Sequence, residues 1–419
     1  MSSKIKNVDM FSSLPEELLS HILSLMPTKY AVRTSILSKR WRYSWMFVTN
    51  FDFDGTRTNP FHGLDRFTKF VDRVLNDCKT SKINLFRLQF YETCVQKLST
   101  SSWIDKAVRL NVCELDIRSI QLELPLSLFT CKTLTKLRLE RWACDGKDWG
   151  CPSSVNLPCM KTLDVVVHRD PFVNAFKLIG GCPMLESLSL EVTRRKKFAG
   201  CYIFNIPTLK RLKLTFALVI TSDINKVVLR VPNLEYLFLG GVLCSLFQME
   251  DVSSLVEVSV SLRHIAYDYL WVELLNGVSG VKSLLTQDIP SSFLLPIFPN
   301  MNCLELGKFW HYRQILQFLE SCPGLRHLYI EKSGKSHWIE PEVVPACLLT
   351  NLKTVKLSKC KGYKRDLHFL EYILWYAEVL EIVTVTWENL CMEKERELCL
   401  WLLELPRASK YCEIHFIGD

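Results

Sequence analysis

A short hydrophobic pattern recurs along most of the chain, in which an apolar residue is followed by apolar residues three and five positions later. The pattern occurs thirteen times between residues 85 and 385, and its ninth copy, Val281-Leu284-Thr286, is weak because it ends in threonine. The copies begin at Leu85, Val112, Leu134, Met160, Leu185, Leu209, Leu234, Leu255, Val281, Met301, Leu325, Leu352 and Leu380. Subtracting successive positions gives intervals of 20 to 28 residues, and such a period predicts an array of stacked repeats.

Each copy predicts one short strand whose alternate side chains face a core. The remaining ~18 residues of each repeat are expected to return by a helix or an irregular segment. Stacked units of this kind give an α/β fold, a curved solenoid with a parallel sheet on its concave face. Six copies have a proline two residues ahead of the first apolar position, which predicts an extended chain entering the strand. These prolines are Pro158, Pro183, Pro207, Pro232, Pro299 and Pro323.

The N-terminal segment shows a helical spacing instead. From Pro15 to Met26, apolar residues recur at spacings of three and four with polar residues between them, which predicts an amphipathic helix. Ser13, Thr28 and Ser38 are candidate N-caps of this helix and of two shorter ones. Three such helices cannot enclose their large side chains alone, because domains below about 40 residues usually need a partner or a staple. The segment is therefore predicted to dock on another protein.

The remaining segments complete a domain plan. Residues 51–84 begin with turn-rich sequence and end with a helical spacing, which predicts a connector and a cap for the first repeat. The C-terminal pattern predicts a helix over 367–377, a strand over 380–387, a helix over 393–405 and a strand over 412–416. The expected domains are a flexible N-terminus (1–8), the helical segment (9–50), the connector and cap (51–84), the repeats (85–346) and a segment that continues and caps them (347–419).

Three stretches resemble those of a known family. The Leu14-Pro15 pair, the spaced aliphatic residues after it and the run from Ser38 to Arg42 resemble an F-box. The triplets resemble leucine-rich repeats, although most copies lack the Asn or Cys expected after the strand, which predicts irregular repeats. The stretch CLLTNLKTVKLSKCKG and the later EKERELCLWLLELPRASKYCEIHF resemble the FBD segment. Over essentially its full length, the chain thus resembles the plant F-box/FBD/LRR family.

The resemblance implies two binding surfaces. In that family the F-box docks on the Skp-type adaptor of a cullin-based ubiquitin ligase. By position, the adaptor contacts would be Leu14, Pro15, Leu18, Ile22, Val32, Leu37 and Trp41. The repeats would bind a target protein on the concave face, where Tyr, Phe and Arg are the residue types enriched at protein–protein hot spots. The candidate substrate contacts are Arg138, Arg211, Lys213, Tyr236, Phe238 and Tyr329.

Composition narrows the range of partners. The net charge of +8 on 419 residues is too small to indicate nucleic-acid binding. The basic run from Arg194 to Lys197 favours a solvated loop over a nuclear localisation patch.

No apolar stretch approaches the length of a membrane span and the N-terminus has no apolar signal region, so we expect no membrane contact and a cytoplasmic and/or nuclear location. The 17 cysteines are interpreted as free thiols.

No sequence signature indicates catalysis, a metal or a cofactor, since G-x-S-x-G, H-E-x-x-H, the P-loop and G-x-G-x-x-G are all absent. The leading hypothesis is a non-catalytic substrate receptor of an SCF-type (Skp–cullin–F-box) ubiquitin ligase, joined through the adaptor to a cullin and a RING subunit. One alternative is a non-degradative repeat scaffold or decoy. A sensor with a small-molecule pocket is another. More distant is a cysteine-based enzyme, whose Cys and His would meet only in space.

Overall fold

The computed structural model describes residues 14–56, 63–90, 100–119, 124–141, 151–168, 173–193, 200–217, 224–243, 245–263, 268–287, 294–307, 310–331 and 338–417. The chain divides into two compact units, Met1–Thr193 and Arg194–Asp419. Ser13, the basic run from Arg194 to Lys197 and the predicted flexible stretch 1–8 lie outside the described residues. Among the described helices, none is long and apolar enough to span a membrane.

The first unit begins with a cluster of short helices, here called the helical segment. Its elements are α1 (Glu16–Ser24), α2 (Thr28–Arg33), η2 (Thr34–Ile36), α3 (Trp41–Ser44) and η3 (Trp45–Phe47). Its core contains the buried side chains of Leu19, Leu23, Ala31, Trp41 and Trp45. The three predicted helices are confirmed, each shorter than the pattern that predicted it.

Hydrogen bonds join the helical segment to the strand that follows it. The hydroxyl of Thr28 accepts a 2.7 Å bond from the backbone N–H of Asp52, and that of Ser24 accepts a 3.2 Å bond from the N–H of Thr49. The predicted N-cap role of Thr28 is wrong, because its hydroxyl is used across this junction and α2 has no side-chain cap. The predicted N-cap role of Ser38 is also wrong, because Arg40 is the N-cap of α3, although the Ser38 hydroxyl accepts a 3.4 Å bond from the N–H of Trp41.

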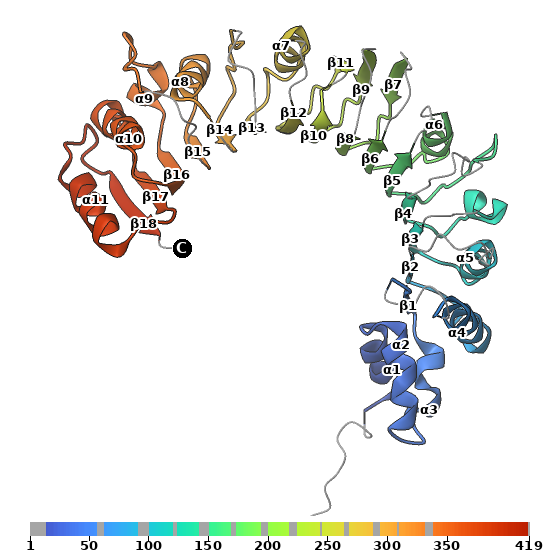
Figure 1. The fold of residues 1–419 in the computed structure, drawn as a ribbon. Helices are drawn as coiled ribbons and strands as arrows, with labels where there is room; N and C mark the ends of the chain where they lie inside the picture. The colour runs from blue at the N-terminus through green and yellow to red at the C-terminus, as the bar shows by residue number, and fades with distance from the viewer. Residues whose placement is uncertain are drawn as a thin grey trace, which may run out of the picture. The chain divides into compact units, whose positions relative to one another are not determined.

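Six strands of the first unit form a parallel sheet, in the order β1-β2-β3-β4-β5-β6 among the described residues. They are β1 (Asn50–Asp54), β2 (Leu85–Phe90), β3 (Glu114–Ser119), β4 (Lys136–Arg141), β5 (Thr162–His168) and β6 (Ser187–Thr193). Helices α4 (Gly63–Asp77), α5 (Thr100–Arg109) and α6 (Val173–Gly180), with the turn η4 (Leu126–Thr130), lie along one face of this sheet (Figure 1). The other face, called the open face below, carries no helix among the residues that the structure describes.

The second unit repeats this layering. Its parallel sheet contains β8 (Arg211–Ala217), β10 (Tyr236–Val242), β12 (Glu257–Arg263), β13 (Ser283–Thr286), β14 (Cys303–Leu306), β15 (His327–Ile330), β16 (Thr354–Cys360), β17 (Ile382–Trp387) and β18 (Glu413–Ile417). The helices are α7 (Asp268–Gly277), α8 (Tyr312–Ser321), α9 (Ala346–Thr350), α10 (Lys364–Tyr376) and α11 (Met392–Glu404). The predicted C-terminal helices and strands are confirmed, as is the repeat fold with its parallel sheet.

A second, three-stranded sheet occupies the place of returning helices in part of this unit (Figure 1). Its order is β11-β9-β7, and its parallel strands are β7 (Cys201–Asn205), β9 (Asn225–Arg230) and β11 (Ser245–Asp251). Tyr202 and Phe204 are buried while their neighbours along β7 are exposed, a period of two that indicates a strand. The prediction of helical or irregular returns is wrong here.

All thirteen hydrophobic copies correspond to strands in the part of the chain that the structure describes. In twelve of them the first apolar residue is buried two positions before its strand begins, as Leu134 is before β4. The first predicted copy is two residues late, because Phe86, not Leu88, is in register with Leu115 of the next strand. The true first copy is Ile83-Phe86-Leu88, and all three side chains are fully buried.

The prolines ahead of the strands lie in turns. Around Pro232, the N–H of Leu234 donates a 2.9 Å bond to the carbonyl of Val231, and the other five prolines have the equivalent bond. Proline is favoured at the second position of such β-turns because its φ is fixed near the required value. The predicted extended entry is therefore wrong, and the prolines reverse the chain just before these six strands.

Candidate interaction surfaces

Helix α1 carries apolar side chains on two sides. Leu19 and Leu23 are fully buried in the helical segment. Leu18, Ile22 and Leu25 follow one another at spacings of four and three, and 49%, 37% and 72% of their surfaces are exposed. These three residues, here called the α1 stripe, share a helix face. Contiguous exposed apolar surface marks interaction sites, so the stripe is a candidate docking surface.

The rest of the helical segment adds exposed apolar side chains to this surface. They are Tyr30, Ile36, Leu37, Tyr43 and Phe47, and Ile36 is 85% exposed. Together with the α1 stripe, eight large apolar side chains are exposed between residues 18 and 47. A partner that covers this apolar surface removes it from water, and this burial stabilises the complex.

The seven predicted adaptor contacts differ in exposure. Pro15, Leu18, Ile22 and Leu37 are exposed, and Leu14 and Val32 are half-buried. Trp41 is 8% exposed and belongs to the core of the helical segment. A substitution at Trp41 therefore perturbs the folding of the segment as well as its surface.

Sequence reasoning did not single out five of the exposed apolar residues as contacts. They are Leu25, Tyr30, Ile36, Tyr43 and Phe47. Their apolar character at helical spacing was a usable signal. Periodicity shows that a helix has an apolar face, but it does not show which apolar residues the segment covers by itself.

A groove of about 720 Å³ lies between the helical segment and α4. Its apolar lining includes Val32, Ile36, Tyr43, Phe70 and Val74. Its basic lining residues are Lys39, Arg42 and Arg73, and Arg73 forms a 3.6 Å ion pair with Asp77. Because Ile36 and Tyr43 belong to both, the groove continues the exposed apolar surface of the helical segment.

The open face of the first unit carries a row of alternating charges. Consecutive register partners across five strands are Asp52, Arg87, Asp116, Arg138 and Asp164. Directly opposed residues in a sheet interact, and opposite charges there stabilise the pairing. The row therefore holds each arginine between two carboxylates on neighbouring strands.

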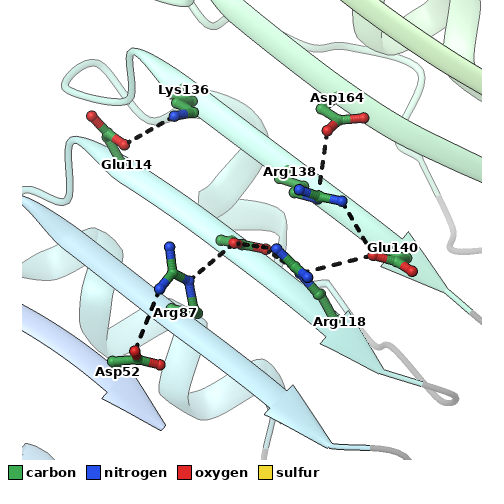
Figure 2. A network of polar contacts seen from close by, with 9 residues as sticks. Asp52, Arg87, Glu114, Arg118, Lys136, Arg138, Glu140 and Asp164 are labelled. Atoms are coloured by element: carbon green, nitrogen blue, oxygen red, sulfur yellow. Dashed lines mark hydrogen bonds and ion pairs between the residues drawn. The ribbon is translucent and has the colours of Figure 1, made fainter. Parts of the chain in front are cut away.

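Four more residues complete this charge ladder, which Figure 2 shows from close by. Arg118 lies 3.1 Å from Asp116 and 3.8 Å from Glu140, and Arg138 lies 3.5 Å from both Glu140 and Asp164. The last pair is Lys136 with Glu114, at 3.5 Å. Four cations thus meet five carboxylates, so the open face of β1–β5 is nearly neutral and its charges are already paired.

The open face of β8 and β10 in the second unit is different. Arg211 and Lys213 are exposed on β8, and their register partners on β10 are aromatic, Tyr236 and Phe238. The guanidinium carbon of Arg211 lies 5.7 Å from the ring centre of Tyr236, and the Nζ atom of Lys213 lies 5.1 Å from that of Phe238. Neither cation has a carboxylate partner among the described residues. Both are therefore available to an anionic group.

The structure brings together four of the six predicted substrate contacts, the cation–aromatic pairs on β8 and β10. Tyr329 lies on β15 of the same sheet, four strands from β10 and so about 19 Å away. Arg138 belongs to the first unit, where Glu140 and Asp164 neutralise it.

The described residues offer little for catalysis. Burial raises the pKa of the Cys182 and Cys347 thiols to about 12, and a thiol is a poor nucleophile while it stays protonated. Among the described residues, no group of three or more His, Cys, Asp or Glu side chains could hold a metal ion.

Family models match three parts of the chain. Residues 11–50 match the F-box domain and residues 340–385 match the FBD. Residues 100–203 match the model of the LRR repeats of the FBD-associated F-box protein At5g56370. The F-box match covers the helical segment with its exposed apolar surface, and the FBD match covers α9, β16 and α10 and most of β17.

Relatives from Arabidopsis thaliana match nearly the whole chain. The F-box/LRR-repeat protein At2g42720 is 31% identical, and the alignment covers 98% of this chain and all of the relative. The FBD-associated F-box protein At5g56370 is 30% identical with the same coverage. The F-box/FBD/LRR-repeat protein At1g78750 is 28% identical over 98% of this chain and 96% of its own length. The chain belongs to the F-box/FBD/LRR-repeat family, as the sequence resemblance predicted.

Proposed function

We propose that this chain is the substrate-recognition subunit of an SCF-type ubiquitin ligase. Its F-box binds a Skp-type adaptor, which connects it to a cullin and a RING subunit, and its repeats bind a protein that is to be ubiquitinated. The chain catalyses nothing in this role. It raises the local concentration of the target beside the transfer site, so that a bimolecular encounter becomes an intramolecular one.

The exposed apolar surface of the F-box carries the proposal. Full burial of an exposed aliphatic side chain contributes about 1.5–3 kcal/mol, and each residue of the α1 stripe gains the share of this that its exposed 37–72% represents. Ile36, Leu37 and Tyr43 extend this surface, so an interface of the usual total size, roughly 1,200–2,000 Å², is within its reach. The basic groove residues beside it favour an adaptor with acidic side chains at its rim.

The cation–aromatic pairs of β8 and β10 support a target site in the second unit. Their aromatic rings offer apolar contact area, and their cations have no carboxylate partner in the described part of the chain. The charge ladder of the first unit supports the same assignment by contrast, since a target would have to break existing ion pairs there. We therefore assign target contact to Arg211, Lys213, Tyr236 and Phe238.

The test compares two variants of the full chain in co-purification with a Skp-type adaptor and a cullin. The double substitution Leu18→Asp/Ile22→Asp places two carboxylates in the α1 stripe, whose side chains are exposed, so the fold is retained. Leu126→Asp, at an exposed leucine of η4 in the same unit, is the matched control. We expect the double variant to lose the adaptor and cullin and the control to retain both.

Two results would contradict the proposal. Equal adaptor recovery with both variants would exclude this docking surface. Retained adaptor binding with no change in the half-life of a captured target, when the protein is present or absent, would favour a non-degradative scaffold or decoy. Melting curves of each variant show whether a loss of binding reflects a loss of structure.

A further inference from the structure

An aromatic pocket of about 450 Å³ lies in the C-terminal part of the second unit, against helix α10. Its lining residues are Trp338, Glu340, His368, Glu371, Tyr372, Trp375 and Tyr376. Five of the seven come from α10 and two from the short segment before α9. The pocket therefore lies within or beside the residues that match the FBD, far along the chain from the F-box.

Four of the lining residues are tryptophan or tyrosine, and three of their rings form a continuous series through Tyr372. The ring centres of Trp338 and Tyr372 are 5.2 Å apart, and those of Tyr372 and Tyr376 are 4.8 Å apart. The two interplanar angles are 54° and 48°, so successive rings are inclined and not stacked flat. Trp375 stands at the rim with 56% of its surface exposed. A ligand in the pocket therefore meets several aromatic rings at once.

The polar lining of the pocket is acidic. Glu340 and Glu371 contribute two carboxylates, and among the lining residues only His368 can carry a positive charge. The hydroxyl of Tyr376 donates a 3.3 Å hydrogen bond to Glu340, which fixes that carboxylate beside the rings. The two acids and the negative ring faces act in the same direction, toward a cation.

The environment of Tyr372 disfavours a negative charge at this site. Its side chain is almost fully buried, and its hydroxyl has no hydrogen-bond partner among the described residues. Burial is the largest cause that raises the pKa of Tyr372, and the neighbouring Tyr376 and Glu340 raise it further. Burial disfavours a charge of either sign, so what points to a cation is the contribution of Glu340, whose carboxylate repels a phenolate and attracts a positive charge.

We propose that this pocket binds an alkylammonium group, carried either on a lysine side chain of a peptide or on a small free molecule. Aromatic rings with an acidic neighbour are the chemistry that recognises quaternary and methylated ammonium ions. An anion would face two carboxylates. A neutral apolar group would leave the charges of Glu340 and Glu371 without a counter-ion. The site is distinct from the adaptor and target surfaces and does not depend on the proposed ligase role.

The test titrates the full chain with four probes and follows tryptophan fluorescence and heat of binding. The probes are an acetylated, amidated peptide with one trimethyllysine, the same peptide with unmodified lysine, the same peptide with the neutral tert-butyl isostere of trimethyllysine, and choline. We expect the trimethyllysine peptide to bind at least tenfold more tightly than its neutral isostere, because the two differ in charge and not in shape. Choline distinguishes the two sources: affinity equal to that of the peptide assigns a free ammonium ligand, and weaker affinity assigns a peptide.

Matched variants locate the binding. Trp375→Ala and Glu371→Gln change lining residues, and each should weaken trimethyllysine binding at least fivefold. Tyr411→Ala and Glu342→Gln change exposed residues outside the pocket and should leave affinity unchanged. Equal affinity for the neutral isostere, no binding of any probe at millimolar concentration, or unchanged binding by both pocket variants would overturn the proposal. Adaptor recovery is expected to be unchanged in all four variants, so failure here is separable from failure of the ligase role.

Discussion

Arg118 donates two hydrogen bonds to the carboxylate of Asp116, both of 3.1 Å, along a single strand of the first unit. Arg87 donates a third bond of the same length to Asp116 from the neighbouring strand. Asp116 is buried, with 8% of its surface exposed, and it accepts bonds from two arginines, so this carboxylate is the centre of the charge ladder. Its loss would leave two guanidinium groups with fewer partners at a poorly solvated position.

We therefore expect Asp116→Asn to lower the free energy of unfolding by about 1.5–3 kcal/mol, the range for hydrogen bonds to charged groups. Calorimetric melting of the full chain measures the effect. Glu114→Gln is the control, because the Glu114–Lys136 pair is half-exposed at 3.5 Å and such pairs contribute about 0–1 kcal/mol. Equal effects of the two substitutions would show that the ladder is a set of independent surface pairs.

The sequence was sufficient to predict the repeat strands. It did not predict strand β1, the small sheet or the side-chain contacts between strands. Buried apolar triplets such as Leu134-Leu137-Leu139 recur because every strand must fill the same core. Strand β1 was missed because only Phe51 and Phe53 are apolar in it, and the small sheet because its strands lie between two better matches. The charge ladder needs the register of five strands. Its signal was present in the alternating Arg and Asp that stand between the apolar residues, such as Arg87 and Asp116.

The candidate sites were predictable to different degrees. The helical spacing of apolar residues in the N-terminal segment predicted an apolar docking segment. This spacing could not show that Trp41 belongs to the core while Leu37 is exposed. The cation–aromatic pairs were named as single residues, and only the pairing of β8 with β10 places Arg211 beside Tyr236. The aromatic pocket was not predicted, because it joins α10 to a segment about thirty residues away in sequence.

Charge reversal on β8 should separate target binding from adaptor binding. We expect Arg211→Glu/Lys213→Glu to abolish target capture while adaptor recovery is unchanged, because both side chains are exposed on the open face of the second unit. The stability cost should stay near 1–2 kcal/mol, the sum of two exposed cation–π contacts. Quantitative mass spectrometry of co-purified proteins measures both. Lys226→Glu, an exposed change on β9 of the small sheet, is the control, and equal target loss there would refute the assignment to β8.

Thiol reactivity should follow the raised cysteine pKa values. Burial raises the pKa of Cys182 and Cys347 from 9.0 to about 12, so at pH 8 both remain protonated and resist alkylation, since the thiolate is the nucleophile. Iodoacetamide should instead modify the exposed Cys159, Cys201 and Cys391, as peptide mass spectrometry can show. Because the folded pKa is the higher one, the two buried thiols also cost stability as pH rises from about 9 toward 12. Full labelling in denaturant is the control, and native labelling of Cys182 would contradict the prediction.

Gly241 should tolerate no side chain. Its φ is +90°, and a Cβ atom there would lie 2.1 Å from the carbonyl oxygen of Phe216 on the neighbouring strand β8. We expect Gly241→Ala to lower stability by at least about 2 kcal/mol, since backbone strain and overpacking each cost about 1–3 kcal/mol. That corresponds to a fall in Tm of about 4–8 °C for a unit of this size. Gly280→Ala is the control, because a Cβ atom at Gly280 has no neighbour within 4 Å, and its Tm should match the parent's. If the two variants melted together, the close approach of β10 to β8 at Gly241 would not constrain the sheet that carries Arg211 and Lys213.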